Sequence, residues 1–257
     1  MQTLDTTNGI ASPVSFSVVK DRHGFIWVST RLGIDRYDGL HFKHYSLTKS
    51  NMRLSDEGVR YDIFPNTDNG IYVYSDLGKI FLYNEDTDAF EELYCFTEHL
   101  GGHSLHAFSI EPSCLILGLY KGIVIFDRTT QTITSRLCSD TNIRCIISFI
   151  NGTYLVGSEK GLYLLDLAKK SCELIACPEL DIISLYYDAE QQRIWLGTKG
   201  KGLWTMRLDN TDIKQIQNYE HAIVTSIAPY ADSQLLVGVD GDGLLVTSRI
   251  FISSLRS

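Results

Sequence analysis

Short apolar runs alternate with polar, glycine-containing turns along nearly the whole chain. In the first such unit, an apolar run at residues 26–30 is followed by a polar turn that ends at Gly33 and by a second run at 34–37. Runs of this length between turn residues are typical of β-strands. Because no stretch keeps the 3.6-residue apolar period of a helix, the pattern predicts an all-β protein.

The same unit recurs five more times, and each copy places a glycine just before its second apolar run. These turn glycines are Gly33, Gly78, Gly122, Gly161, Gly202 and Gly243. They follow one another at intervals of 39 to 45 residues, 42 on average, which is the period of a propeller blade. A four-stranded sheet cannot bury both faces by itself, so successive sheets must stack. We therefore predict a β-propeller of about six four-stranded blades, with seven as the alternative.

Each predicted blade contains four antiparallel strands, named a to d in chain order. In the first blade they are 14–20, 26–30, 34–37 and 42–45, and the later a strands are 59–64, 106–110, 143–148, 182–187 and 224–228. The blades cover 14–46, 59–95, 106–138, 143–176, 182–217 and 223–255 within a single domain over 1–257.

Three further features of these blades can be predicted from local chemistry. The turn glycines start strand c, where a positive φ is expected. The strand-b aromatics Trp27, Tyr72 and Trp195 are expected to pack between blades. Residues 2–4 are expected to pair near 251–255 and fasten the ends of the ring.

One motif resembles a known repeat. Residues 21–39 read DRHGFIWVSTRLGIDRYDG, which is similar to the two-component-regulator propeller repeat, with its approximate pattern DxxGxIWxGTxxGLxRYDG. Residues 193–202 echo it, and the other units match more loosely. The chain departs from the pattern in two respects: this family commonly has seven blades, and Tyr74 and Ser75 replace the usual Gly-Thr in the second unit.

The resemblance implies a function. These repeats form the periplasmic sensor region of hybrid two-component histidine kinases, where they bind an oligosaccharide and signal to a kinase, a receiver and a DNA-binding module. We therefore expect a periplasmic, oligosaccharide-sensing domain or fragment that is not itself an enzyme and needs no cofactor. A propeller that serves as a protein-interaction scaffold, without a small-molecule site, is the alternative.

Composition narrows the classes of partner. The chain has 257 residues, 44% hydrophobic, with 31 acidic and 23 basic side chains and a net charge of −8, as in a soluble globular protein. It lacks the Lys and Arg cluster that a nucleic-acid partner requires. No apolar run is long enough for this segment to insert into a membrane, and residues 1–5 do not read as a signal peptide. Another propeller domain or a second copy of the chain remains a candidate partner.

The candidates for metal or catalytic chemistry are weak. The six cysteines form no CxxC motif, and no histidine has zinc-finger spacing. The stretch 240–243 begins like a calcium loop, but Phe251 stands where an EF-hand needs a glutamate. Carboxylates near loops could form a glycosidase pair, although all are also ordinary turn formers; they are Asp76, Glu159, Asp181, Asp240 and Asp242. We expect neither a metal nor catalysis, and the sequence leaves disulfides open.

The turns between strands b and c are the expected binding region, because in a propeller they share a face with the d-to-a connections. Sugar hydroxyls need directional donors and acceptors, and the C–H face of a pyranose packs on a flat ring. The predicted ligand contacts are Arg31, Tyr120, Lys121, Glu159 and Lys199. Each of them also suits a solvated turn.

Overall fold

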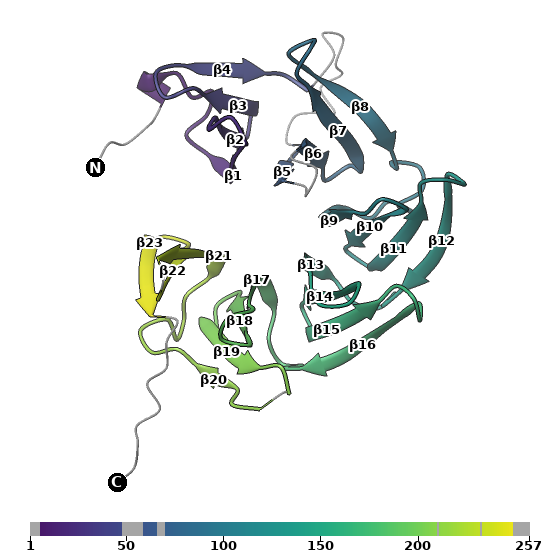
Figure 1. Ribbon diagram of the computed structural model, residues 1–257, viewed down its shortest axis with the longest axis vertical. Helices are drawn as coiled ribbons and strands as arrows, with labels where there is room; N and C mark the ends of the chain where they lie inside the picture. Colours follow the sequence, from purple (N-terminus) through teal and green to yellow (C-terminus); the bar gives the residue numbers. More distant parts are fainter. Residues whose placement is uncertain (1–5, 48–58, 66–69, 210, 232, 249–257) are drawn as a thin grey trace. The chain divides into compact units, whose positions relative to one another are not determined.

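The computed structural model describes residues 6–47, 59–65, 70–209, 211–231 and 233–248, and these are almost entirely β (Figure 1). Within them, the helical structure is one 3-10 turn, η1 (Thr6–Asn8). The chain divides into two compact units, Met1–Ile110 (unit 1) and Glu111–Ser257 (unit 2).

Unit 1 holds two antiparallel sheets in which sequential strands are neighbours. The first contains β1 (Ser15–Lys20), β2 (Ile26–Thr30), β3 (Gly33–Tyr37) and β4 (Phe42–Tyr45). The second contains β5 (Tyr61–Pro65), β6 (Ile71–Ser75), β7 (Lys79–Asn84) and β8 (Ala89–Cys95). Strand β9 (Leu105–Ile110) is the first strand of the third sheet.

Unit 2 continues the series in the same order. The third sheet adds β10 (Cys114–Leu119), β11 (Gly122–Asp127) and β12 (Thr132–Leu137). The fourth contains β13 (Ile143–Ser148), β14 (Thr153–Ser158), β15 (Gly161–Asp166) and β16 (Ser171–Ala176). The fifth contains β17 (Ile182–Asp188), β18 (Arg193–Thr198), β19 (Leu203–Arg207) and β20 (Lys214–Gln215), and the sixth β21 (Val224–Ala231), β22 (Gln234–Val239) and β23 (Gly243–Ser248).

The described residues thus form six sheets, five of four strands and one of three. This confirms the predicted all-β, six-bladed propeller; the count is six rather than seven. The predicted contact of residues 2–4 with 251–255 falls outside the described residues.

The core is built by the b strands and by their contacts with the next blade. All six residues of β18 are buried, as expected for a strand covered on both faces. In unit 2 one apolar cluster joins Leu155 of the fourth sheet to Ile182 and Leu196 of the fifth. In unit 1 the fully buried ring of Trp27 lies against Phe90 of the second sheet, with ring centroids 5.7 Å apart. This confirms the predicted inter-blade packing for Trp27.

All six turn glycines have a positive φ, as predicted. In unit 2, the amide of each of three of them donates to the connection that enters the following blade. These bonds join Gly122 to the Thr141 oxygen at 2.8 Å, Gly161 to the Leu180 oxygen at 3.0 Å, and Gly202 to the Ala222 oxygen at 3.0 Å. The b-to-c turns and d-to-a connections therefore share one end of the sheets. We call this end the turn edge of unit 2; it comprises the turns at 120–122, 159–161, 199–202 and 240–243, and the connections at 138–142, 177–181 and 216–223.

Candidate functional site

Four of the five predicted contacts lie on the turn edge of unit 2. Tyr120 and Lys121 lie in the third blade's turn, Glu159 in the fourth and Lys199 in the fifth, and all four are exposed. The Tyr120 side chain is 52% exposed, so part of its ring faces solvent. The turn edge thus presents the predicted mixture of an aromatic ring and charged groups.

Backbone hydrogen bonds link these turns to the entries of the a strands. The Glu159 carboxylate accepts the Asn142 amide at 3.4 Å, next to the Thr141 oxygen that holds the third blade's turn. The Lys199 amide donates to the Asp181 oxygen at 2.8 Å. The structure therefore brings these four residues onto adjacent positions along one edge.

A bidentate ion pair on the same edge was missed by sequence reasoning. The Arg144 guanidinium donates to both carboxylate oxygens of Asp181, each at 2.9 Å, and both side chains are about three-quarters buried. The sequence singled out Asp181 only as one of several loop carboxylates. Its partner Arg144 lies 37 residues earlier, at the start of strand a in the preceding blade. Only an alignment of successive blades in the sequence could have suggested this pair.

Arg31, the fifth predicted contact, belongs to unit 1. It is exposed at the end of β2, and its amide donates to the Val14 oxygen at 3.1 Å. Arg31 therefore belongs to a different unit from the other four predicted contacts.

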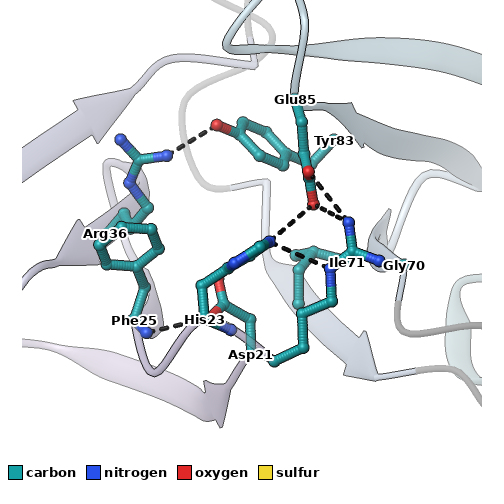
Figure 2. A pocket seen from close by; sticks show the side chains of 9 residues that line it. Asp21, His23, Phe25, Arg36, Gly70, Ile71, Tyr83 and Glu85 are labelled. Carbon is teal, nitrogen blue, oxygen red and sulfur yellow. Dashed lines mark hydrogen bonds and ion pairs between the residues drawn. The ribbon is translucent and has the colours of Figure 1, made fainter.

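Unit 1 also contains a pocket of about 210 Å³ (Figure 2). It lies at the opposite end of β2 from Arg31, where the a-to-b turn of the first sheet meets β6 and the end of β7. Its lining residues are Asp21, Arg22, His23, Phe25, Arg36, Gly70, Ile71, Tyr83 and Glu85. None of them was among the predicted contacts.

Asp21 fixes the turn that forms one wall of the pocket. One carboxylate oxygen accepts the amides of His23 and Phe25, each at 2.9 Å. The other accepts the indole N–H of Trp27 at 2.7 Å. The acidic residue and the tryptophan of the repeat motif are therefore bonded to each other, and Asp21 has a structural role.

The rim of the pocket carries a charged pair from two sheets. The Arg22 guanidinium donates to both oxygens of Glu85, at 2.9 and 3.0 Å, and the His23 ring lies 3.4 Å from the same carboxylate. These side chains are about half exposed. An exposed pair of this kind contributes little to stability, so a ligand can replace it at small cost.

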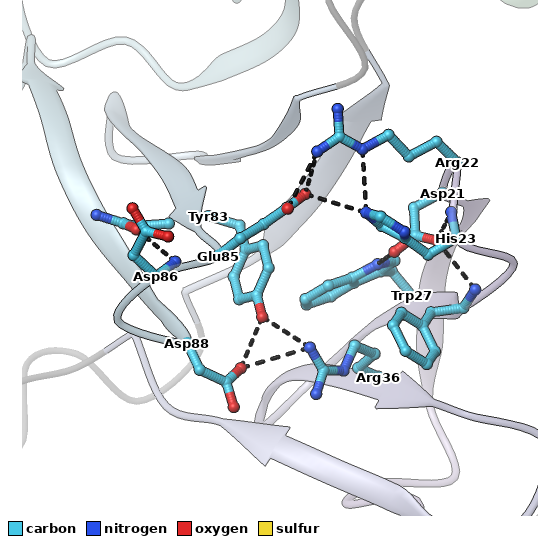
Figure 3. A network of polar contacts seen from close by, with 11 residues as sticks. Asp21, Arg22, His23, Trp27, Arg36, Tyr83, Glu85, Asp86 and Asp88 are labelled. Atoms are coloured by element: carbon cyan, nitrogen blue, oxygen red, sulfur yellow. Dashed lines mark hydrogen bonds and ion pairs between the residues drawn. The ribbon is translucent and has the colours of Figure 1, made fainter.

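Arg36 lines the pocket and belongs to a network of polar contacts with Tyr83 and Asp88 (Figure 3). The guanidinium lies over the Phe25 ring, 4.8 Å from its centroid, and donates to the Tyr83 hydroxyl at 2.7 Å. The hydroxyls of Tyr45 and Tyr83 each donate to Asp88 at 2.6 Å. The hydrogen bond from Lys43, followed by those from the two tyrosines, holds the pKa of Asp88 well below its usual range.

Comparison with known proteins identifies the fold. No family model and no curated protein matches the sequence. The extracellular domain of BT4673 from B. thetaiotaomicron, described as a hybrid two-component system, matches with a TM-score of 0.73, 23% identity and 92% coverage of this chain. The extracellular domain of BT3049 from the same organism, described in the same way, matches with a TM-score of 0.74, 19% identity and 96% coverage.

The chain shares the fold of these extracellular domains. It covers 32% of the BT4673 chain and 35% of the BT3049 chain, about one third of each. The part of this chain that the structure describes contains no helix long and apolar enough to span a membrane.

The Asp88 network of this propeller predicts a pH effect. Because the pKa of Asp88 is lowered on folding, its ionisation stabilises the fold above the unfolded-state value of about 4. This stabilisation is lost as the pH falls through the folded-state pKa. We expect the Asp88→Asn variant to be less stable than the wild type near pH 6, and the difference to shrink steadily between about pH 4 and pH 2.

Urea unfolding across this pH range measures the difference. Asparagine is the matched replacement, because it keeps the shape of aspartate and tolerates the positive φ of 48° at this position. A difference that stays constant with pH would contradict the role given to the Asp88 charge.

Proposed function

We propose that this chain is a ligand-sensing, extracytoplasmic domain, or a fragment of one, in a hybrid two-component histidine kinase, and that it binds an oligosaccharide without turning it over. The domain would reside in the periplasm. In this proposal the chain senses the ligand, and phosphoryl transfer belongs to other domains of the protein.

Two observations support a sensor role. The proteins that share the fold are described as extracellular domains of such systems, and this chain corresponds to about one third of each. The motif at 21–39 resembles the repeat of the same class of sensors. Because structural matches at 19 to 23% identity establish only the fold, ligand binding must be supported by the site itself.

The observation that carries the sugar proposal is the unit 1 pocket. Its lining combines the Phe25 and Tyr83 rings with the polar rim pair Arg22 and Glu85. Rings suit the C–H face of a pyranose, and a guanidinium beside a carboxylate offers donors and acceptors to hydroxyls. A volume of about 210 Å³ is below the roughly 300 Å³ of small drug sites, so it suits one sugar ring, with the remaining units outside.

The same pocket supports binding rather than hydrolysis. Glycoside hydrolysis needs two carboxyl groups that flank the scissile bond, one of them free to donate a proton. Both Asp21 oxygens already accept hydrogen bonds from the turn and from Trp27. Asp21 therefore holds the turn and is not free to donate a proton. Among the lining residues, this leaves Glu85 without a second carboxyl group that could act as the acid.

The turn edge of unit 2 is the second candidate site for the same ligand. The predicted contacts Tyr120, Lys121, Glu159 and Lys199 are exposed there, next to the Arg144–Asp181 pair. An extended oligosaccharide could lie across adjacent turns. We keep this edge as a separate site to be tested against the pocket.

Calorimetry with a panel of oligosaccharides tests the proposal and separates the two sites. We expect Arg22→Ala with Glu85→Ala to weaken binding by about 30-fold or more, because each of the two unpaired polar groups costs about 1–3 kcal/mol. Lys121→Ala with Lys199→Ala, on the turn edge, is the matched control and should leave the affinity unchanged. The melting temperatures of both variants verify that they fold.

The reverse pattern would place the ligand on the turn edge. If neither variant loses binding, both sites are excluded. If the wild-type chain binds no oligosaccharide in the panel, the sugar proposal fails.

A protein-interaction scaffold is the alternative, and one surface favours it. Leu244 and Val246 of β23 are 67% and 50% exposed, and their spacing places both on one face of the strand. Exposed apolar side chains that share a face are typical of protein contacts. A scaffold would be stabilised in a thermal-shift assay by another propeller domain or a second copy, and not by sugars.

A further inference from the structure

Two cysteines on the outer strands of neighbouring blades in unit 2 form a close pair. Cys138 directly follows β12, the outermost strand of the third blade, and Cys172 lies in β16, the outermost strand of the fourth. The Cys138 thiol donates a hydrogen bond to the Cys172 carbonyl oxygen, with the sulfur and oxygen atoms 3.7 Å apart. Both residues are free thiols in the structure and are half-buried, so a small reagent can reach them.

The surroundings of Cys138 favour reaction at this pair. The thiolate is the form of cysteine that attacks a disulfide. The neighbouring Cys172 side chain lowers the pKa of Cys138. By contrast, Cys145 is enclosed beside Gly157 and Ile182, and burial raises its pKa to about 12. Oxidation should therefore begin at Cys138 rather than at Cys145.

We propose that Cys138 and Cys172 form a disulfide that joins the outer strands of two neighbouring blades. The oxidant is a disulfide-bearing small molecule or thiol oxidase. The Cys138 thiolate attacks one sulfur of this disulfide and releases the other as a thiol. The Cys172 thiolate then attacks the Cys138 sulfur, which releases the second thiol, so the cysteines lose two hydrogens and the oxidant gains them.

Such a bond would join two outer strands whose residues are largely open to solvent. Along β12, three of the six residues are exposed and the other three are half-buried. The cysteines are 34 residues apart, so the crosslink would close a loop that is open in the reduced unfolded chain. Closing a loop of this size substantially lowers the conformational entropy of the unfolded chain, which stabilises the folded state. The periplasmic location proposed above would supply the oxidising conditions, although the pairing itself does not depend on any sugar site.

Peptide mapping of the oxidised full chain tests the pairing directly. The protein is treated with oxidised glutathione near pH 8 and digested, without reduction, by trypsin and a glutamate-specific protease. Cleavage at Glu173 separates Cys172 from Cys177, so the expected product is peptide 137–144 linked to peptide 171–173. The intact mass should fall by two hydrogens, and the melting temperature should rise by roughly 5–10 °C.

Three variants control the result. Cys138→Ser and Cys172→Ser should each abolish the linked peptide and the rise in melting temperature. Cys95→Ser, at an exposed cysteine that contacts Thr97, should leave both unchanged. A wild-type chain that stays singly glutathionylated, that links Cys138 to a different cysteine, or that gains no thermal stability on oxidation would overturn the proposal.

Discussion

Replacing Gly202 by alanine should destabilise the protein by about 3 kcal/mol or more, since it adds backbone strain to a steric clash. The φ of Gly202 is +76°, in the region that side chains disfavour. A Cβ at this position would lie 1.9 Å from the Tyr219 carbonyl oxygen, far inside any non-bonded contact. The backbone at 219–220 would have to move, and with it the entry to the last blade. Urea unfolding measures the loss.

Gly243→Ala is the matched control for this prediction. Gly243 occupies the same place in the next repeat and has a similar φ of +81°, but a Cβ there would meet no atom within 4 Å. Its replacement should cost only about 1 kcal/mol, from backbone strain. If both variants lose the same stability, crowding at Gly202 is not the cause.

Trp27→Ala should cost about 3–5 kcal/mol, as expected for removal of a buried tryptophan. Its side chain is fully buried, with the Tyr83 ring centroid 4.7 Å away and the Arg36 guanidinium 5.4 Å from its own ring. The cavity would open between the first and second sheets, behind the pocket. Chemical denaturation gives the change in unfolding free energy.

Two further variants separate the contributions of Trp27. Trp27→Phe keeps a ring but removes the N–H that donates to Asp21 at 2.7 Å, so its cost should be smaller, about 1–2 kcal/mol. Trp204→Ala removes a half-buried tryptophan and should also cost less than Trp27→Ala. If Trp204→Ala is equally damaging, burial between sheets does not explain the importance of Trp27.

The strands could be predicted because their signals are local and repeated. The predicted strands at 42–45 and 143–148 coincide with β4 and β13. In each blade, a few turn residues and short apolar runs determine where the chain reverses. A period repeated six times then makes the sheet count visible without any knowledge of long-range contacts.

The candidate sites depend on contacts that no local pattern encodes. The Arg22 and Glu85 side chains meet across two sheets, 63 residues apart in the chain. The repeat motif contains Asp21 and Trp27 but does not show that Tyr83 and Glu85 complete a pocket beside them. Similarly, Gly202 and Gly243 read alike in the sequence, and only the position of the Tyr219 backbone distinguishes them.

In unit 2, the hydrogen bonds of three turn glycines each link one blade to the blade that follows it in the chain. The amides of Gly122, Gly161 and Gly202 each hold the entry to the next blade, so a turn that opens releases the neighbour with the higher residue numbers. Fluctuations should therefore spread from one blade to the next along the chain, as in other nearest-neighbour arrays. Hydrogen exchange at these three amides would report this propagation, and a ligand that stiffens one turn would slow exchange in the blade that follows it.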